Sequence, residues 1–450
     1  MRPIKIALAA CLLIPTLLWA FADTLWPEPF TYFTFRRSFM QYSGVVLIAV
    51  MSVAMILALR IKWLERYLDG LDKMYRLHKW LGISALIIGV MHWWWGKFTK
   101  WMVGWGCLTK PSSVGGMGPG DGSGQLFPVL QDWVMSQRAL AETVGEWGFY
   151  VAVILIALAL IKRFPYHLFI STHKILAITY LLFVYHSLIL MHFFYWSDVI
   201  SWFVLFLMLL GSYAAVVTLF KKIGANRKVP GHITEIDYFP SLQMLEISIE
   251  LTDGWPGHKA GQFAFVRSSK QERAHPYTIS SGWTPSKPQI NMIIKELGDH
   301  TSRLPKQLTV GTPVSVEGPY GCFTFEDTQP RQIWIGAGIG ITPFIARLQS
   351  LATTPDGKEI TLFHPTVGYD EEAISKLNAH AAAAGVTLHL VLNDRDPLLT
   401  RERICELVPE WRSASIWFCG PAGFGQSLRE DFKAQGLASQ HFHQELFEMR

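Results

Sequence analysis

The chain has 450 residues, half of them apolar, and its mean hydropathy is +0.24. This composition is more apolar than that of a typical soluble protein and predicts membrane-spanning segments. The formal net charge of +5 does not indicate nucleic-acid binding, because Lys and Arg occur in short clusters between apolar runs. The five cysteines include no C-x-x-C pair, so a disulfide framework, a zinc site or an iron–sulfur cluster is not expected.

Apolar stretches of spanning length predict six transmembrane helices. They lie at 5–22, 40–60, 77–96, 147–162, 170–193 and 199–220. The first stretch ends on Ala20-Phe21-Ala22 and could instead be a cleaved signal peptide, but we favour a retained helix.

The connections between these stretches predict the orientation of the chain. Those at 60–79, 161–174 and 221–228 are rich in Lys and Arg, whereas the turn at 192–198 contains neither. The basic connections should face the cytosol, which places the connection at 97–146 outside, together with its Gly-rich tract at 115–120. We therefore expect a multi-pass protein of the inner (plasma) membrane with cytosolic C-terminal domains.

Two further domains follow the membrane bundle, which we assign to residues 1–224. Residues 225–328 contain short alternating strands separated by Gly and Pro turns, and this pattern predicts a small antiparallel β-barrel. In residues 329–450, apolar strands alternate with helical stretches, which is typical of a doubly wound parallel sheet. The fold class is therefore a multi-domain membrane protein with a six-helix bundle, an antiparallel β-barrel and an α/β domain.

Four histidines lie in or beside two of the apolar stretches. His78 and His92 are fourteen residues apart and fall within about 40° of one helix face, whereas His173 and His186, thirteen apart, are separated by about 140°. The predicted orientation pairs His78 with His173 at the inner level and His92 with His186 at the outer level. Facing imidazoles are suitable axial ligands for haem, so we predict two haems; hydrogen bonding between helices is the alternative.

Other polar residues in the membrane region are less clearly assigned. His167 and His192 lie outside the register of the four histidines, and we interpret them as interfacial residues. Arg36 and Arg37 begin the second helix on the outer side, where they could pair with haem propionates or attract an anionic or oxygen-derived species. An interfacial anchor is the alternative for both arginines.

Motifs in the C-terminal half indicate a flavin and a nicotinamide. HPYTIS places an aromatic ring between groups that can contact an isoalloxazine, and residues 298–301 are predicted to open a helix that can hold a pyrophosphate. GAGIGITP follows a strand and precedes a helix, as dinucleotide-binding turns do, and CGP ends a strand at the carboxyl edge of the same sheet. The predicted cofactor-binding residues are His275, Pro276, Tyr277, Thr278, Ser280, Gly298, Thr301, Gly336, Gly338, Gly340, Thr342, Pro343, Cys419, Gly420 and Pro421.

With these motifs the chain resembles the ferric reductase and NADPH oxidase superfamily, and within it the bacterial NADPH oxidase-like transmembrane flavocytochromes b. The resemblance includes Leu77-His78-Lys79, Thr172-His173-Lys174, HPYTIS, GAGIGITP and CGP, together with the histidine spacings of fourteen and thirteen. It implies an FAD-binding barrel, a ferredoxin-reductase-like nucleotide domain and two b-type haems held by the four histidines.

The resemblance also assigns two catalytic candidates. It implies that Arg36 acts near the outer haem, where oxygen is reduced. Phe447 could cover the flavin ring and be displaced by the nicotinamide, although three residues follow it and core packing is the alternative. Residues 364–369 lack the arginine that family members commonly carry there, so the choice between NADPH and NADH is left open.

The expected function is transmembrane electron transfer from cytosolic NADPH or NADH, through FAD and two haems, to an external acceptor. Oxygen, which would give superoxide, is the leading acceptor. The alternatives are a ferric-chelate reductase and an electron-relay subunit for a partner protein or quinone. The lipid bilayer, the nicotinamide and the acceptor are the expected partners; nucleic acid is not expected, and no protein partner is indicated.

Overall fold

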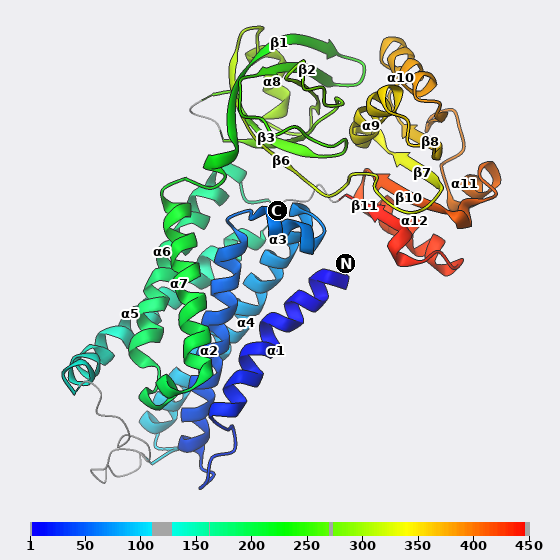
Figure 1. Cartoon of the computed structure of the whole chain (residues 1–450). Coiled ribbons are helices and arrows are strands. Elements are labelled where there is room, and N and C mark those ends of the chain that lie inside the picture. The colour runs from blue at the N-terminus through cyan, green and yellow to red at the C-terminus, as the bar shows by residue number, and fades with distance from the viewer. Residues whose placement is uncertain (1, 110–127, 162, 270–272, 446–450) are drawn as a thin grey trace. The chain divides into compact units, whose positions relative to one another are not determined.

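The computed structural model describes residues 2–109, 128–161, 163–269 and 273–445, which form two compact units (Figure 1). The helical unit comprises the residues up to Ile61 together with Lys73–Ile223. The sheet unit comprises Lys62–Asp72 and the residues from Gly224 onward. The Gly-rich tract at 115–120 and Phe447 lie outside the described residues.

Long helices run through the helical unit. They are α1 (Arg2–Ala22), α2 (Tyr32–Leu57), α4 (Leu71–Gly104), α5 (Pro128–Leu160), α6 (Tyr166–Leu190) and α7 (Val199–Leu219). Within the described part of the chain, five of them are long and apolar enough to cross a membrane, and α4 is not among these five. The stretch at 77–96 is therefore helical as expected, but the count of six spans is not confirmed. The reason is that α4 also carries polar residues such as His92, Lys97 and Lys100.

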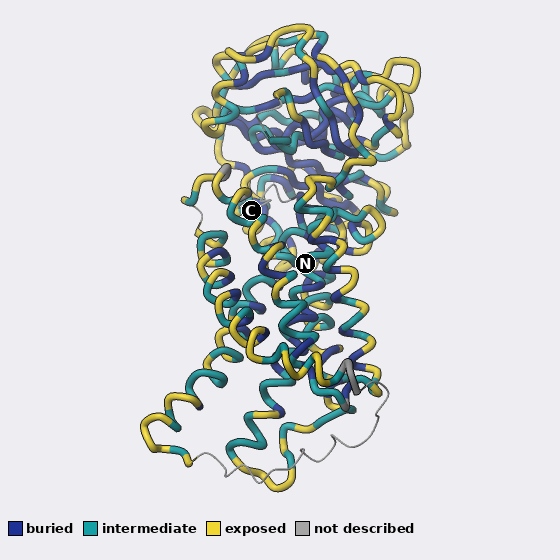
Figure 2. The backbone as a smooth tube through the Cα atoms, turned by 90° about the vertical axis from the view of Figure 1, so that its left-hand side faces the viewer, coloured by how far each residue is buried: buried dark blue, intermediate teal, exposed yellow. Residues whose placement is uncertain are grey.

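The outside of the helical unit is covered by apolar side chains. Leu13, Phe206 and Leu209 are each more than half exposed, and Figure 2 shows that most residues of these helices are intermediate or exposed. A surface of this kind suits contact with lipid, because exposing a large apolar patch to water is unfavourable. By contrast, Trp19 of α1 is 2% exposed and donates to the Tyr195 hydroxyl at 3.1 Å, so α1 contributes to the packed core of this unit.

Two helices are longer than the sequence predicted. The connection expected at 97–146 is helical at both ends, because α4 continues to Gly104 and α5 begins at Pro128. The charges that made these ends look like a loop are paired between the two helices: Lys97 Nζ lies 2.5 Å from Glu146 Oε1, and Lys100 Nζ lies 3.7 Å from Glu142 Oε2. Pairing lowers the cost of placing charged side chains on helices near the membrane.

The sheet unit begins with an antiparallel sheet. Its strands are β1 (Lys228–Phe239), β2 (Met244–Leu251), β3 (Phe263–Arg267), β4 (His275–Thr278), β5 (Gln289–Lys295) and β6 (Pro313–Tyr320), in the order β4-β3-β6-β1-β2-β5. A bridge between Ile279 and Met292 links the end of β4 to β5 and brings the two edges of the sheet together. Alternate residues such as Ile247 and Ile249 fill its core.

A parallel sheet follows, as predicted. Its strands are β7 (Arg331–Gly336), β8 (Glu359–Thr366), β9 (Thr387–Leu392), β10 (Ala414–Cys419) and β11 (Phe442–Gln444), in the order β11-β10-β7-β8-β9. The helices that cover it are α9 (Thr342–Thr353), α10 (Glu371–Ala383), α11 (Arg401–Leu407) and α12 (Ala422–Ala434). Trp334 belongs to one hydrophobic core with α9 and α10, whereas Ile333 and Ile335 belong to a second core with α11 and α12. The sheet is therefore covered on both faces.

Short elements complete the structure. They are α3 (Lys62–Leu68), α8 (Leu304–Gln307), and the 3₁₀ turns η1 (Phe193–Ser197), η2 (Ala225–Arg227), η3 (Thr301–Arg303), η4 (Gly338–Ile341), η5 (Trp411–Ser413) and η6 (Ser439–His441). Helix α3 lies between α2 and α4 in sequence but belongs to the sheet unit. There Glu65 Oε1 accepts a hydrogen bond from the Gly321 N–H at 2.6 Å, and burial raises the pKa of this carboxyl.

Asp327 fixes the segment that leads from the antiparallel to the parallel sheet. Its carboxylate accepts hydrogen bonds from Lys358 Nζ at 2.7 Å, from Gln332 Nε2 and Trp417 Nε1 at 3.0 Å, and from the Ser415 hydroxyl. Burial alone would raise the pKa of this carboxyl, but the hydrogen bonds from Lys358, Ser415 and Trp417 lower it below its ordinary value. The ionised carboxylate therefore stabilises the folded sheet unit.

Replacing Asp327 by Asn should lower the free energy of unfolding of the sheet unit by about 2 kcal/mol, because hydrogen bonds to a charged acceptor are lost. The stabilisation is present above the unfolded pKa of about 3.9 and is lost as the pH falls through the depressed folded pKa. The check is the thermal unfolding midpoint of the purified full-length variant at pH 7, where the stabilisation is fully present. Glu326→Gln is the matched control, since its carboxylate is exposed. Equal midpoints for the two variants at pH 7 would contradict this role.

Candidate functional site

The four histidines of the helical unit form two pairs between α4 and α6. The ring centroids of His78 and His173 are 5.9 Å apart, and those of His92 and His186 are 6.5 Å apart. We call these the first pair and the second pair. Helix α6 is continuous, yet both of its histidine rings reach α4, although an ideal helical wheel separates them by about 140°.

The separation within each pair suits two imidazoles that share one metal. Two imidazole–metal bonds of about 2 Å each, plus the roughly 1 Å from a ring nitrogen to its ring centre, place the centroids about 6 Å apart. The observed 5.9 and 6.5 Å lie close to this value. Bis-histidine ligation of a haem therefore fits the positions of these side chains.

Hydrogen bonds orient three of the four rings. The Nδ1 atoms of His78 and His186 lie 2.9 Å and 2.8 Å from the carbonyl oxygens of Ala54 and Ala141. A carbonyl can only accept, so Nδ1 carries the proton and Nε2 keeps its lone pair. That is the tautomer a metal ligand needs, with the second nitrogen held by an acceptor.

The ring of His92 is oriented by the hydroxyl group of Ser43. Its Nδ1 lies 2.9 Å from Ser43 Oγ, and the Ser43 hydroxyl donates to the Phe39 carbonyl at 2.7 Å. The serine has one proton, so it accepts from His92, whose Nε2 is again left free to bind a metal. His173 Nδ1 is buried and has no hydrogen-bond partner among the described residues.

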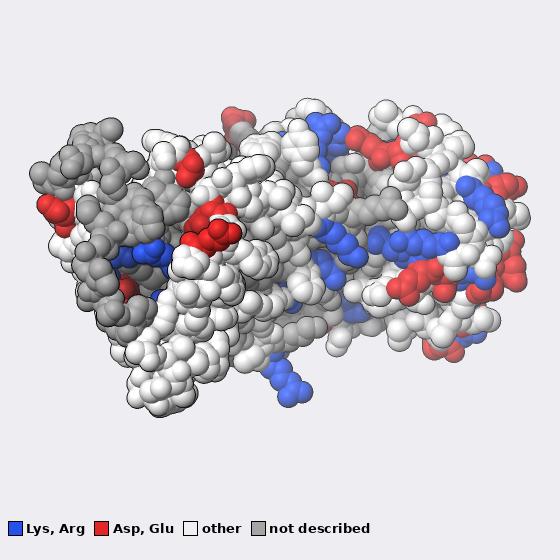
Figure 3. Space-filling model, turned by 90° about the horizontal axis from the view of Figure 1, so that it is seen from below, with Lys and Arg blue, Asp and Glu red and all other residues white. Residues whose placement is uncertain are grey.

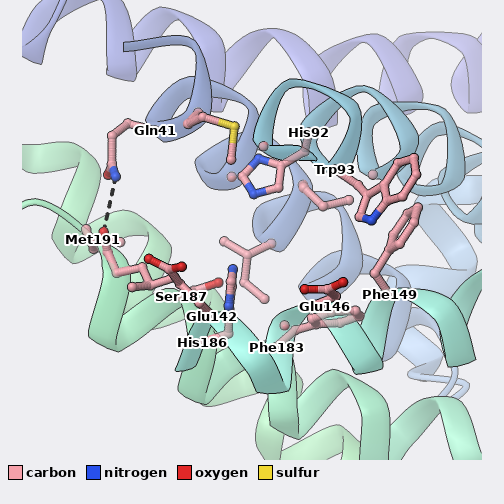
Figure 4. Close-up of a pocket in the computed structure, with 18 of the residues that line it drawn as sticks. Gln41, His92, Trp93, Glu142, Glu146, Phe149, Phe183, His186, Ser187 and Met191 are labelled. Atoms are coloured by element: carbon pink, nitrogen blue, oxygen red, sulfur yellow. Dashed lines mark hydrogen bonds between the residues drawn. The ribbon is translucent and has the colours of Figure 1, made fainter. Parts of the chain in front are cut away.

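A cavity of about 670 Å³ surrounds the second pair. His92 and His186 point toward each other from opposite walls in Figure 4. Basic and acidic side chains from three helices also line this cavity, and Lys and Arg are visible in a hollow on the left of Figure 3. The basic residues are Arg36, Arg37, Lys97, Lys100 and Arg138, and the acidic ones are Glu142 and Glu146. The excess of basic over acidic side chains in this cavity suits the binding of carboxylates such as haem propionates.

Arg36 lines the cavity that holds the second pair. Its Nε donates to the Trp95 carbonyl at 3.3 Å, which orients the guanidinium at the cavity. His192, interpreted from the sequence as interfacial, lines the same cavity, whereas the side chain of His167 is outside the described part of the chain.

The predicted flavin motif occupies β4 and the residues after it. Ser280 is 1% exposed, and its hydroxyl has no hydrogen-bond partner among the described residues. A buried hydroxyl of this kind suits a polar edge of a bound flavin. Nearby, the ring of His275 stacks on that of His300 with centroids 3.7 Å apart, and His300 Nε2 lies 3.1 Å from the Tyr277 hydroxyl.

The segment expected to open a helix at 298–301 forms only short helical turns. These are the turn η3 and the four residues of α8. The backbone N–H groups of Leu297 and Gly298 are already bonded to Thr301 Oγ1, at 2.9 and 3.2 Å. The Thr301 hydroxyl therefore satisfies these two donors locally, and a pyrophosphate site at this segment stays a prediction.

The glycine-rich turn and the CGP segment meet at the carboxyl edge of the parallel sheet. The Ala337 N–H donates to the Cys419 carbonyl at 2.9 Å, and a Cβ on Gly340 would lie 2.2 Å from that oxygen. Only glycine allows this approach, and Pro343 then occupies the first turn of α9. Burial raises the pKa of the Cys419 thiol well above its ordinary value, so Cys419 is a neutral thiol.

The segment at 364–369 is divided between core and surface. Burial lowers the pKa of His364, and its neutral ring donates from Nδ1 to the Gly336 carbonyl at 2.6 Å. Tyr369 is 48% exposed, and the Arg395 guanidinium lies over its ring, 5.6 Å from the centroid. An arginine therefore reaches this segment, but it comes from the residues after β9.

Sequence reasoning missed the residues that hold the histidine rings and pair the cavity charges. Ser43 and the carbonyl of Ala141 carry no motif, and a carbonyl has no sequence signal at all. Lys97 and Glu146 were visible as charges beside apolar stretches, and their pairing could have been proposed had α4 and α5 been extended toward each other.

Two family models match separate parts of the chain. Residues 43–184 match the ferric reductase like transmembrane component, and residues 232–324 match an FAD-binding domain. The first range contains His78, His92 and His173 and ends two residues before His186, and the second contains HPYTIS.

Known proteins resemble parts of this chain. An NADPH oxidoreductase of Mycobacterium tuberculosis is 28% identical over 43% of this chain and 52% of its own length. Respiratory burst oxidase homolog protein E of Arabidopsis thaliana is 26% identical over 41% of this chain and 22% of its own length. A flavohemoglobin structure from Malassezia yamatoensis, 19% identical, covers 72% of this chain and 88% of its own with a TM-score of 0.46. The chain spans about half the length of the first curated relatives it matches.

The two matched domains define a membrane flavoprotein of the oxidoreductase class. A ferric-reductase-like membrane component followed by an FAD-binding domain is a particular combination within that class. This combination is typical of the ferric reductase and NADPH oxidase superfamily.

Replacing Ser280 by Ala should weaken FAD binding about tenfold, because the flavin loses one hydrogen bond in a buried site. The check is a fluorescence titration of FAD into flavin-depleted full-length protein. Ser286→Ala is the control, since Ser286 is exposed and outside the motif. Equal affinities for the two variants would remove Ser280 from the flavin site.

Proposed function

We propose that the chain oxidises NADPH or NADH on the cytosolic side of the membrane and delivers the electrons to an acceptor on the outer side, with oxygen giving superoxide. The observation that carries this proposal is the pair of histidine contacts between α4 and α6. Two pairs with centroids 5.9 and 6.5 Å apart, fourteen residues apart along α4, offer two metal positions through the thickness of the helical unit.

When bound, FAD would convert a hydride into single electrons and two b-type haems would relay them. The side chains of this protein hold and insulate those groups. His78 and His173 would ligate at the inner level, and His92 and His186 at the outer level. No side chain has to act as a general acid or base in these transfers.

The orientation follows from the basic connections. The segments at 60–79, 161–174 and 221–228 are proposed to be cytosolic, which leaves the cavity of the second pair on the outer side. Helix α4 is then a sixth membrane span, whose polar residues face the cofactors. The antiparallel sheet, whose edges meet at Ile279 and Met292, is proposed as the flavin barrel.

We propose domain limits at 1–224, 225–328 and 329–450, which agree with the ends of the helices and strands. The last long helix ends at Leu219, β1 begins at Lys228, and β7 begins at Arg331, three residues into the third range. The segment 62–72 departs from this scheme, because it clusters with the sheet unit although it precedes α4.

A ferric chelate is the second candidate acceptor. The five basic residues that line the outer cavity exceed its two carboxylates, which favours an anionic molecule. Among the described residues, no group of three His, Cys, Asp or Glu could hold a free metal ion. A metal acceptor would therefore arrive as a chelate, whereas oxygen would need no binding group.

The experiment is superoxide-dismutase-sensitive reduction of cytochrome c by the purified protein in air, with NADPH and with NADH. A hydride supplies a pair of electrons, so a pair of superoxide ions should form for each nicotinamide oxidised. Reduction of ferric citrate without oxygen is the parallel assay for the second candidate. Ferric citrate reduction with no superoxide in air would contradict the oxygen proposal, and inactivity in both assays would favour a relay to a partner.

A further inference from the structure

The ring of His186 docks on one turn of α5. Its Nδ1 donates to the Ala141 carbonyl at 2.8 Å, and Gly145 lies four residues further along the same helix. Residues four apart share a face of an α-helix, so the ring reaches the carbonyl by passing over Gly145. The contact is therefore between an imidazole and bare helix backbone.

A side chain at 145 would block this approach. A Cβ built on Gly145 would lie 2.1 Å from Nδ1, 2.3 Å from Cε1 and 2.9 Å from Cγ of His186, all closer than real Cβ contacts. Two other glycines of the helical unit, Gly44 and Gly82, are not constrained in this way. A Cβ on Gly44 would lie at an ordinary 3.5 Å from His92 Cε1, and one on Gly82 would meet nothing within 4 Å.

The hydrogen bond that Gly145 permits sets the direction of the ligand. With Nδ1 held by Ala141, the ring of His186 is turned so that Nε2 is available to the cavity it shares with His92. Within the helix, the same carbonyl is the acceptor expected for the Gly145 N–H. A ring pushed off this carbonyl would lose both its orientation and the acceptor that raises its basicity as a ligand.

We propose that Gly145 is a positioning residue for the outer haem ligand, acting through His186 and the Ala141 carbonyl. This inference rests on the proposed haem ligation by the second pair. Among the described glycines of α5, none meets a ring of the first pair in this way, and His78 bonds instead to Ala54 of α2. Loss of the glycine should therefore affect one haem and leave the other intact.

The test compares wild type, Gly145→Ala and Gly82→Ala as purified full-length proteins, by haem content and by redox titration of the haem bands. Gly145→Ala should lose one of two haems, or shift the midpoint of one alone, while Gly82→Ala keeps both. The unaffected haem serves as the internal control for folding. Two unchanged haems in Gly145→Ala would overturn the inference only, whereas a wild type without haem would overturn the proposed function and the inference with it.

A second pair of variants covers the case in which Gly145→Ala fails to fold. In His186→Gly the missing ring leaves space for a methyl group at 145, so His186→Gly/Gly145→Ala should fold as the single variant does. Added imidazole can replace the lost ligand, and its binding is followed by the haem spectrum. The double variant should bind imidazole about tenfold more weakly, because the Ala141 carbonyl is blocked. Equal affinity in the two backgrounds would overturn the role of Gly145.

Discussion

The helical unit depends on bringing imidazoles from α4 and α6 face to face inside an apolar bundle. Each ring is a polar group that would be costly to bury alone, so each needs partners on its nitrogens. Three of the four find one partner in the protein: the carbonyls of Ala54 and Ala141 and the hydroxyl of Ser43. The opposite nitrogen of these three rings is left available, and in the proposed function a metal shared between two rings occupies it.

The same constraint explains the polar residues around the second pair. Lys97 and Lys100 of α4 pair with Glu146 and Glu142 of α5, so two helices that carry charge can continue past the apolar stretches. The excess of positive charge lies at the cavity that holds His92 and His186. In this account the arginines neutralise the carboxylates of a cofactor or attract an anionic acceptor, and the ion pairs between α4 and α5 shape the walls.

Part of this organisation was predictable from the sequence. Alternation with period two predicted strand β2, a short apolar run predicted strand β10, and the spacing of His78 and His92 predicted that both rings lie toward one face of α4. The helical wheel failed for His173 and His186, because ring contacts depend on how two helices cross as well as on the angular position of each residue.

The ends of α4 and α5 were missed, since isolated charges resemble a loop until their partners are known. The segment predicted to open a helix at 298 forms only the short turns η3 and α8, and the Thr301 hydroxyl accepts from the N–H groups of Leu297 and Gly298. Gly145 had no signal, because only the position of His186 makes its missing side chain matter.

Reduction of the haem bands by nicotinamide tests the central claim most directly. The purified protein, loaded with FAD and kept free of oxygen, should show b-type haem absorption that shifts to the reduced spectrum when NADPH or NADH is added. The account also predicts that His92→Ala loses one haem and can no longer pass electrons to an outer acceptor. Haem bands that stay oxidised with both nicotinamides, or an unchanged haem content in His92→Ala, would contradict it.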